Sequence, residues 1–182
     1  MAEYRGMAYL RRKLECKRTR VNLRYRYYEM KNAVQDFGLV TPPEFKYFSE
    51  CLGWCGKAVD SLADRLGFRT FREDNFDLNT IYQMNNPDVL FSSAILSALI
   101  ASCSFVYIGR DEDGFPRMQV IDGGNATGIV DDTTGLLTEG YAVLQRNDYG
   151  TPVREAYFQR GKTWYYTRGE QPVMEENPAP YP

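Results

Sequence analysis

The stretch from Val89 to Ile108, VLFSSAILSALIASCSFVYI, holds twenty residues without a charged side chain. About twenty apolar residues are enough to cross a bilayer, so a membrane span is one interpretation. Five of the twenty are serines, no basic cluster flanks the stretch, and its last four residues, FVYI, are β-branched or aromatic, as in a strand. The pattern favours a buried helix that ends near Cys103 and turns directly into a central strand.

The chain before this stretch is typical of helices. Residues 3 to 30 predict a long basic amphipathic helix, with a break near Thr19 to Val21 as an open alternative. Its apolar stripe is Met7, Leu10, Leu14, Val21, Tyr25 and Tyr28. After a connector from Asn32 to Val40, Thr41-Pro42-Pro43-Glu44 has the composition of a helix start, because Thr41 can cap the free N–H groups and Pro42 fits the first position.

The second helix is therefore expected from Pro42 to Leu66, ended by Gly67 and followed by a short strand over residues 68 to 71. A third helical stretch begins near Asp77. Asn86 is expected to cap a restarted helix, with Pro87 at its first position and Asp88 at the positive end of its dipole.

After Ile108 the sequence changes to short alternating runs separated by turn residues, which predicts antiparallel hairpins. The expected strands are Phe105–Gly109, Arg117–Asp122, Gly128–Val130, Tyr141–Arg146, Val153–Arg160 and Thr163–Arg168. Helices first and strands after predict an α+β fold, with helices packed on one face of an antiparallel meander. The expected parts are a basic helical arm (1–32), a helical part leading into the first central strand (33–110), β hairpins (111–172) and a Pro-rich connector (173–182).

Charge is divided unevenly along the chain. Residues 1 to 32 hold ten Lys/Arg against three Asp/Glu, net +7, whereas residues 33 to 182 hold twelve against twenty-one, net −9. A basic end on an acidic body indicates a polyanionic ligand or an acidic partner surface, which can be another copy of the same protein. The candidate contacts are Arg11, Arg12, Lys13, Lys17, Arg18, Arg20, Arg24 and Arg26.

Catalytic and metal-binding patterns are scarce. The chain has no histidine, which removes the commonest general base and every His-containing zinc site. Cys51 and Cys55 lie one helical turn apart and could share a soft metal, but two small residues on a buried face is the favoured interpretation. Four aspartates (Asp111, Asp113, Asp131 and Asp132) fall in expected hairpin turns, where backbone geometry explains them. We expect no enzyme activity, no metal and no cofactor.

Tyrosines alternate with arginines near the end of the first helix. Tyr25, Tyr27 and Tyr28 are interleaved with Arg24 and Arg26, a mixture that can stack on bases while the guanidinium groups bind phosphates. The favoured interpretation is an amphipathic helix whose tyrosines pack on the body and whose arginines are solvated or pair with a neighbour. A nucleic-acid-binding module that uses this helix stays the alternative function.

Three segments resemble the N-terminal part of tailed-bacteriophage portal proteins. Residues 26–31, RYYEMK, are similar to an early "YY.G" segment of that family, and residues 54–69, WCGKAVDSLADRLGFR, to its helix with a "VD..A.RL...GF" pattern. Residues 97–108, SALIASCSFVYI, resemble its "AL..G.SFV.V" passage from helix to strand, which an acidic hairpin and an Asp-Asp pair follow. The likeness covers roughly residues 20 to 180; Ser102 stands where the family often has glycine.

The resemblance implies a structural, non-enzymatic role. Portal subunits form a dodecameric ring at one capsid vertex, through which the terminase motor packages double-stranded DNA and through which DNA later leaves. The stretch here resembles the outer wing, so the stem, clip and crown are expected beyond Pro182. The implied partners are other copies of the chain, the terminase motor, capsid or scaffold proteins and head–tail connector proteins, with no membrane partner. The implied location is the virion, and the host cytoplasm during assembly; this chain by itself is expected to be a monomer or low oligomer.

Overall fold

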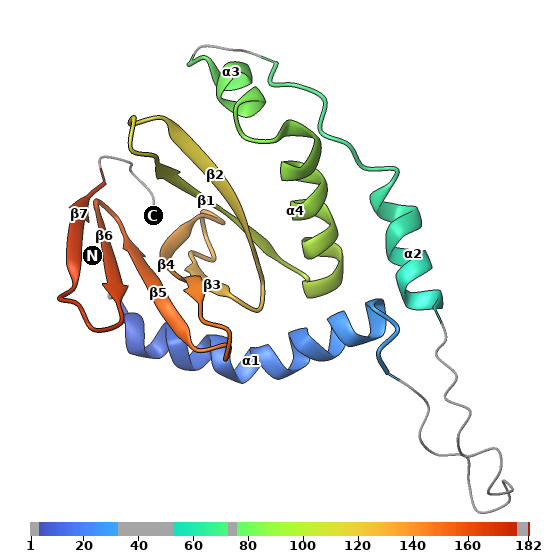
Figure 1. Ribbon diagram of the computed structural model, residues 1–182, viewed down its shortest axis with the longest axis horizontal. Coiled ribbons are helices and arrows are strands. Elements are labelled where there is room, and N and C mark those ends of the chain that lie inside the picture. Colours follow the sequence, from blue (N-terminus) through green and yellow to red (C-terminus); the bar gives the residue numbers. More distant parts are fainter. Residues whose placement is uncertain (1–3, 33–52, 73–75, 178–181) are drawn as a thin grey trace, which may run out of the picture.

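The computed structural model describes residues 4–32, 53–72, 76–177 and 182, and has the expected α+β class, with helices before antiparallel strands (Figure 1). The helices are α1 (Met7–Tyr28), α2 (Trp54–Ala63), α3 (Leu78–Gln83) and α4 (Pro87–Ala101). The strands are β1 (Ser104–Arg110), β2 (Pro116–Asp122), β3 (Ala126–Val130), β4 (Leu137–Arg146), β5 (Pro152–Gln159), β6 (Lys162–Thr167) and β7 (Val173–Glu176).

The strands form two sheets rather than one meander. Strands β3 to β7 make a five-stranded antiparallel sheet in sequence order, while β1 and β2 pair only with each other among the described residues. The strand expected to be central, at residues 105–109, therefore belongs to a two-stranded ribbon. Strand β7 also corrects the expected connector from 173 onward, because Val173 pairs with Tyr165 and Glu176 with Lys162.

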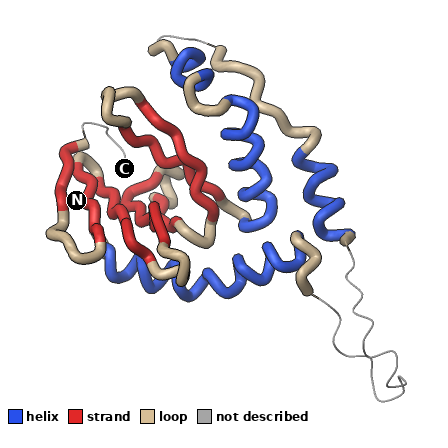
Figure 2. Tube along the Cα trace, viewed as in Figure 1, coloured by secondary structure: helices blue, strands red, loops and turns tan. Residues whose placement is uncertain are grey.

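The ribbon of β1 and β2 lies between the five-stranded sheet and helix α4 (Figure 2). Ile121 of β2 packs with Ala126 and Ala142 of the larger sheet, and Phe105 of β1 lies against the same cluster. The hydroxyl groups of Tyr107 and Tyr165 lie 3.0 Å apart and join the two sheets. Helix α4 contacts both strands of the ribbon and also contacts α1 and α2.

The uncharged stretch folds as a helix that leads directly into a strand. Helix α4 ends at Ala101, two residues before the expected end, because Ser102 adopts a left-handed conformation with φ of 72°. Asn86 precedes Pro87 as expected, but its side chain makes no capping hydrogen bond. Within the described residues, no helix is both long and apolar enough to span a membrane.

The structure decides one open alternative and corrects one other local expectation. Helix α1 runs unbroken from Met7 to Tyr28, so Thr19 to Val21 make no break. Residues 68 to 71 form no strand; instead Phe68 stacks on Phe91 with ring centroids 4.3 Å apart, and Tyr82 meets Phe68 edge-on at 4.8 Å. These aromatic contacts bury ring surface without a partner strand, which explains the loop conformation.

The second helix is shorter than expected at its C-terminal end. Helix α2 ends at Ala63 rather than Leu66, and its expected start at Thr41 to Glu44 lies outside the described residues, as does Cys51. Cys55 is exposed, which contradicts the expectation of a buried face. The turn predictions are confirmed: Asp111 Oδ1 accepts hydrogen bonds from the N–H groups of Asp113 and Phe115, and Asp131 Oδ1 accepts them from the two residues Thr133 and Thr134.

Candidate functional site: the basic helix α1

Helix α1 lies along one edge of the molecule and contacts β3, β4, α4 and α2 (Figure 1). Leu10, Leu14 and Val21 are its buried residues and share one side of the helix, since they are separated by four and seven positions. Leu10 and Leu14 join Tyr141, Val143 and Tyr157 in a core cluster under the five-stranded sheet. This apolar stripe sets the rotation of α1 and so decides where each basic side chain points.

The N-terminal end of α1 is held by a buried carboxylate. Glu139 of β4 is 2% exposed and accepts hydrogen bonds from the backbone N–H groups of Arg5, at 2.8 Å, and Gly6, at 3.1 Å. The hydroxyl of Tyr157 donates to the same carboxylate at 2.7 Å. A negative charge beside the free N–H groups at a helix start is favourable, so Glu139 stabilises the beginning of α1. Burial and the bond to Glu139 together raise the pKa of Tyr157.

A second carboxylate ties the next turn of α1 to the sheet. Arg11 Nη2 donates to Glu155 Oε2 of β5 at 2.7 Å, and the hydroxyl of Tyr141 donates to Glu155 Oε1. Burial, followed by the bond to Glu155, raises the pKa of Tyr141 to about 12. Arg11 is therefore engaged within its own chain.

The C-terminal half of α1 makes polar contacts with helices α4 and α2. Arg24 Nη1 donates to the carbonyl of Ala101 at 3.1 Å and to Ser102 Oγ at 2.6 Å, which places a cation at the negative end of α4. The hydroxyls of Tyr25 and Ser97 lie 3.1 Å apart. Tyr28 donates to Asp60 Oδ1 of α2 at 2.8 Å. Tyr25 and Tyr28 thus pack on the body as expected, whereas Tyr27 is half exposed.

Four of the eight candidate cations form one stripe along α1, at spacings of four, three and four residues: Lys13, Lys17, Arg20 and Arg24. Its two ends are occupied, because Lys13 Nζ donates to the carbonyl of Gly128 at 2.6 Å and Arg24 holds the end of α4. Burial and the nearby charge of Lys17 lower the pKa of Lys13. Lys17 and Arg20, between them, are exposed and have no hydrogen bond or ion pair within the described part of the chain.

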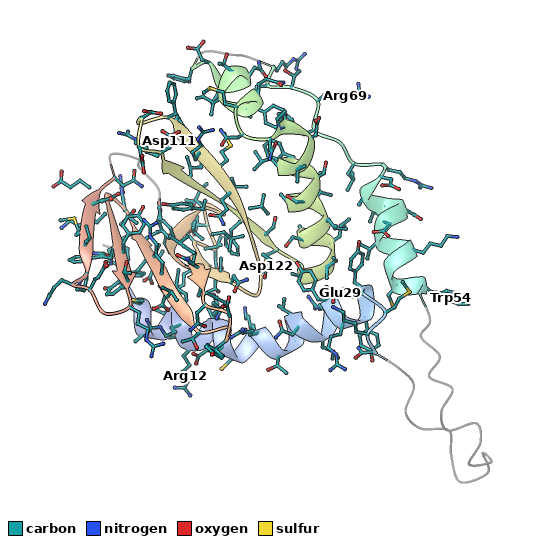
Figure 3. The ribbon with its side chains drawn as sticks, in the orientation of Figure 1. Arg12, Glu29, Trp54, Arg69, Asp111 and Asp122 are labelled. Carbon is teal, nitrogen blue, oxygen red and sulfur yellow. The ribbon has the colours of Figure 1, made fainter. Side chains whose placement is uncertain are left out.

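A second stripe on the other flank holds Arg11, Arg18 and Arg26, and Arg12 points away from the body between the two stripes (Figure 3). Arg18 and Arg26 line shallow hollows between α1 and the sheet, which also contain Arg146 at the end of β4. The sequence pattern did not single out Arg146, because it stands at the end of an alternating strand, before the turn at residues 147–150, where an arginine is unremarkable.

The eight candidate residues therefore separate into two groups. Arg11, Lys13 and Arg24 bind other parts of this chain. Arg12, Lys17, Arg18, Arg20 and Arg26 have no hydrogen bond or ion pair to any described residue. The second group is the part of the basic helix whose charge remains available to a partner.

Outside the basic helix, the described residues offer little that could bind a metal ion or act as an acid or base. No group of three or more Cys, Asp or Glu side chains there is placed to hold a metal ion. The backbone N–H groups of Thr134 and Thr133 lower the pKa of Asp131, which is what an ordinary turn carboxylate experiences. A scan of protein-family models and a search of curated proteins find no match to this chain.

Proposed function

We propose that this chain is the wing-like N-terminal part of a portal-type ring subunit, and that its basic helix contacts an acidic surface of the next copy. In that role the intact ring would carry double-stranded DNA and would meet terminase, capsid or scaffold, and connector proteins in the virion. The likeness of residues 26–31, 54–69 and 97–108 to portal segments supports the family. The charges left free on α1 support the mode of contact.

The observation that carries the proposal is the exposed trio Arg12, Lys17 and Arg20. All three are exposed on α1, and none has a partner among the described residues. Exposed cations of this kind contribute little to folding but steer and orient an acidic partner. Three uncompensated charges on a helix that already has its internal contacts therefore fit an intermolecular role.

Two exposed carboxylates lie on the opposite side of the molecule, in the hairpin between β1 and β2. The hairpin between β1 and β2 carries Asp111, Glu112 and Asp113, and Figure 3 places Asp111 at the edge opposite Arg12. Asp111 is paired with Arg117 at 2.8 Å, whereas Glu112 and Asp113 are exposed and their carboxylates have no partner in the described residues. Unpaired charges of opposite sign on opposite edges suit a head-to-tail contact, which is the kind that closes into a ring.

Zero-length cross-linking tests this arrangement. A carbodiimide joins a lysine amine to a carboxylate only when the two are in contact, and a mixture of ¹⁴N and ¹⁵N chains identifies links between copies. We expect Lys17 to couple to Glu112 or Asp113 of another copy at low ionic strength, and the yield to fall as salt screens the charges. Links between Lys17 and acids of α1 itself, such as Glu15, would indicate a two-fold contact and contradict the ring.

Two charge-reversal variants sharpen the result. Arg12→Glu with Arg20→Glu keeps Lys17 reactive, and we expect roughly a ten-fold lower yield between copies. Arg65→Glu with Arg69→Glu changes the charge equally at exposed positions elsewhere and should leave the yield unchanged. Absence of any link between copies at all salt concentrations, or an equal loss in both variants, would overturn the proposal.

A further inference from the structure

Arg146 is held at the end of β4 by two hydrogen bonds and has no ion pair with an acidic side chain in the described part of the chain. Its Nε donates to Asn125 Oδ1 at 2.9 Å and its Nη1 donates to the carbonyl of Gly150 at 2.8 Å. Both acceptors are neutral, so these bonds fix the guanidinium plane without neutralising its charge, and the carboxylates of Asp122 and Glu155 act on that charge only through space. Burial, followed by the nearby charge of Arg18, lowers the pKa of Arg146.

Two hollows beside α1 share lining residues. The first hollow, of about 290 Å³, extends toward Leu14 and Pro152, and the second, of about 430 Å³, extends toward Asn22. Arg18 and Arg146 are the residues that line both hollows.

Four carboxylates line the same hollows: Glu15, Glu29, Asp122 and Glu155. Three of them are already engaged. Glu155 is bound by Arg11 at 2.7 Å, Glu29 pairs with Lys31 at 2.6 Å, and Asp122 accepts hydrogen bonds from Gly124 N–H at 2.6 Å and from the Asn125 side chain at 2.8 Å. Ion pairs therefore neutralise Glu155 and Glu29, whereas Glu15 and Asp122 keep their charge on the rim.

We propose that Arg18 and Arg146 form a binding site for a phosphate group. Two neighbouring guanidinium groups that are partly removed from water repel each other, and an anion placed between them relieves that cost. The planar guanidinium fork matches phosphate oxygens with paired hydrogen bonds, which a lysine ammonium does not provide. Arg146 is pre-oriented by its two neutral acceptors, and Arg18 supplies the second fork from α1. Nothing in this site uses the exposed trio Arg12, Lys17 and Arg20.

The first measurement is a titration of the ¹⁵N-labelled chain with inorganic phosphate, followed by amide chemical shifts. We expect shifts centred on Gly124, Asn125 and Arg146. Arg18→Gln should weaken phosphate binding at least ten-fold, while Arg12→Gln, on the outward side of the same helix, should leave it unchanged. Arg146→Lys keeps the charge but loses the fork, and should weaken binding although the chain stays folded.

A second arm separates the two sources of phosphate. The same variants are titrated with a short double-stranded DNA at several salt concentrations. Tighter binding of DNA than of inorganic phosphate, with a salt slope that becomes shallower in Arg18→Gln, assigns the site to backbone phosphates; binding of inorganic phosphate alone assigns it to a small phosphate-bearing molecule. The site is refuted if phosphate does not change these amide chemical shifts, or changes them equally in the unmodified chain and in Arg18→Gln. This result is independent of what cross-linking shows about contacts between copies.

Discussion

The two ends of helix α1 are attached to the body in different ways. On the sheet side Leu10 is fully buried, Leu14 is 4% exposed, and the carboxylate of Glu139 is enclosed among three donors. On the helix side Gly56 is the buried residue of α2, and the side chain of Trp54 at its start is 79% exposed. Apolar burial dominates the first contact, whereas exposed polar bonds dominate the second.

The difference predicts an unequal distribution of stability. Burying a leucine side chain contributes about 1.5–3 kcal/mol, while a hydrogen bond near the surface contributes about 1 kcal/mol. The contact of α1 with the sheet should therefore belong to the globally cooperative core, and the contact with α2 should open locally at lower free energy. A change on the sheet side tests the whole fold, and a change on the helix side tests a local attachment.

The largest effect is expected for Leu10→Ala. The substitution leaves a cavity between α1 and the cluster with Tyr141 and Tyr157, and we expect the free energy of unfolding to fall by about 3 kcal/mol. Urea denaturation followed by circular dichroism measures it. Leu23→Ala is the matched control, because Leu23 lies on the same helix but is 44% exposed, and it should cost less than about 0.5 kcal/mol. Equal losses would contradict the assignment of the core to the sheet side.

A smaller effect is expected for Glu139→Gln. The amide keeps the shape of the side chain but loses the charge and one of its two acceptor oxygens, so a backbone N–H at the start of α1 or the Tyr157 hydroxyl loses its partner. We expect a loss of about 2 kcal/mol in the free energy of unfolding. Glu176→Gln removes a carboxylate from the exposed strand β7 and should change stability little. An unchanged stability in Glu139→Gln would contradict the role of this carboxylate at the start of α1.

The smallest effect is expected on the helix side, at Ser102. A left-handed backbone with φ of 72° is strained for serine and relaxed for glycine, but serine also accepts a hydrogen bond from Arg24. We expect Ser102→Gly to stabilise by about 0.5 kcal/mol, because the relief of strain exceeds one exposed hydrogen bond. Ser102→Ala keeps the strain and loses the bond, and should destabilise by a similar amount. If the glycine and alanine variants unfold alike, the backbone at this position is not strained.

Much of the fold could be predicted from local pattern. The positions of α1, α4 and the first six strands followed from hydrophobic period, proline and turn residues, since these signals act within a few residues of one another. The two-sheet arrangement could not be predicted, because hairpin signals fix which strands are adjacent and not where a meander divides. The error at residues 68–71 has the same origin: Phe68 and Phe71 have a strand's composition, but rings from α3 and α4 supply their packing.

The candidate site was predicted only in part. The excess of cations on residues 1 to 32 is a property of the sequence, and so is the division into stripes once the segment is known to be helical. Which cations remain free depends on residues more than seventy positions away. Glu155 accepts a hydrogen bond from Arg11, the Gly128 carbonyl accepts one from Lys13, and the last carbonyl of α4 accepts one from Arg24. Arg146 belongs to the site for the same reason, because the fold places the end of β4 and Arg18 of α1 on the same hollows.

The sequence by itself therefore determined an α+β chain with a basic amphipathic helix at its start and, in the middle, a largely apolar helix that leads into a strand. Composition and period carry that information because they reflect the local cost of exposing apolar groups and of leaving backbone groups unpaired. The tertiary structure decided which charges are used for folding and which remain for a partner. That choice depends on hydrogen bonds and burial between residues distant in the chain, which no local pattern records.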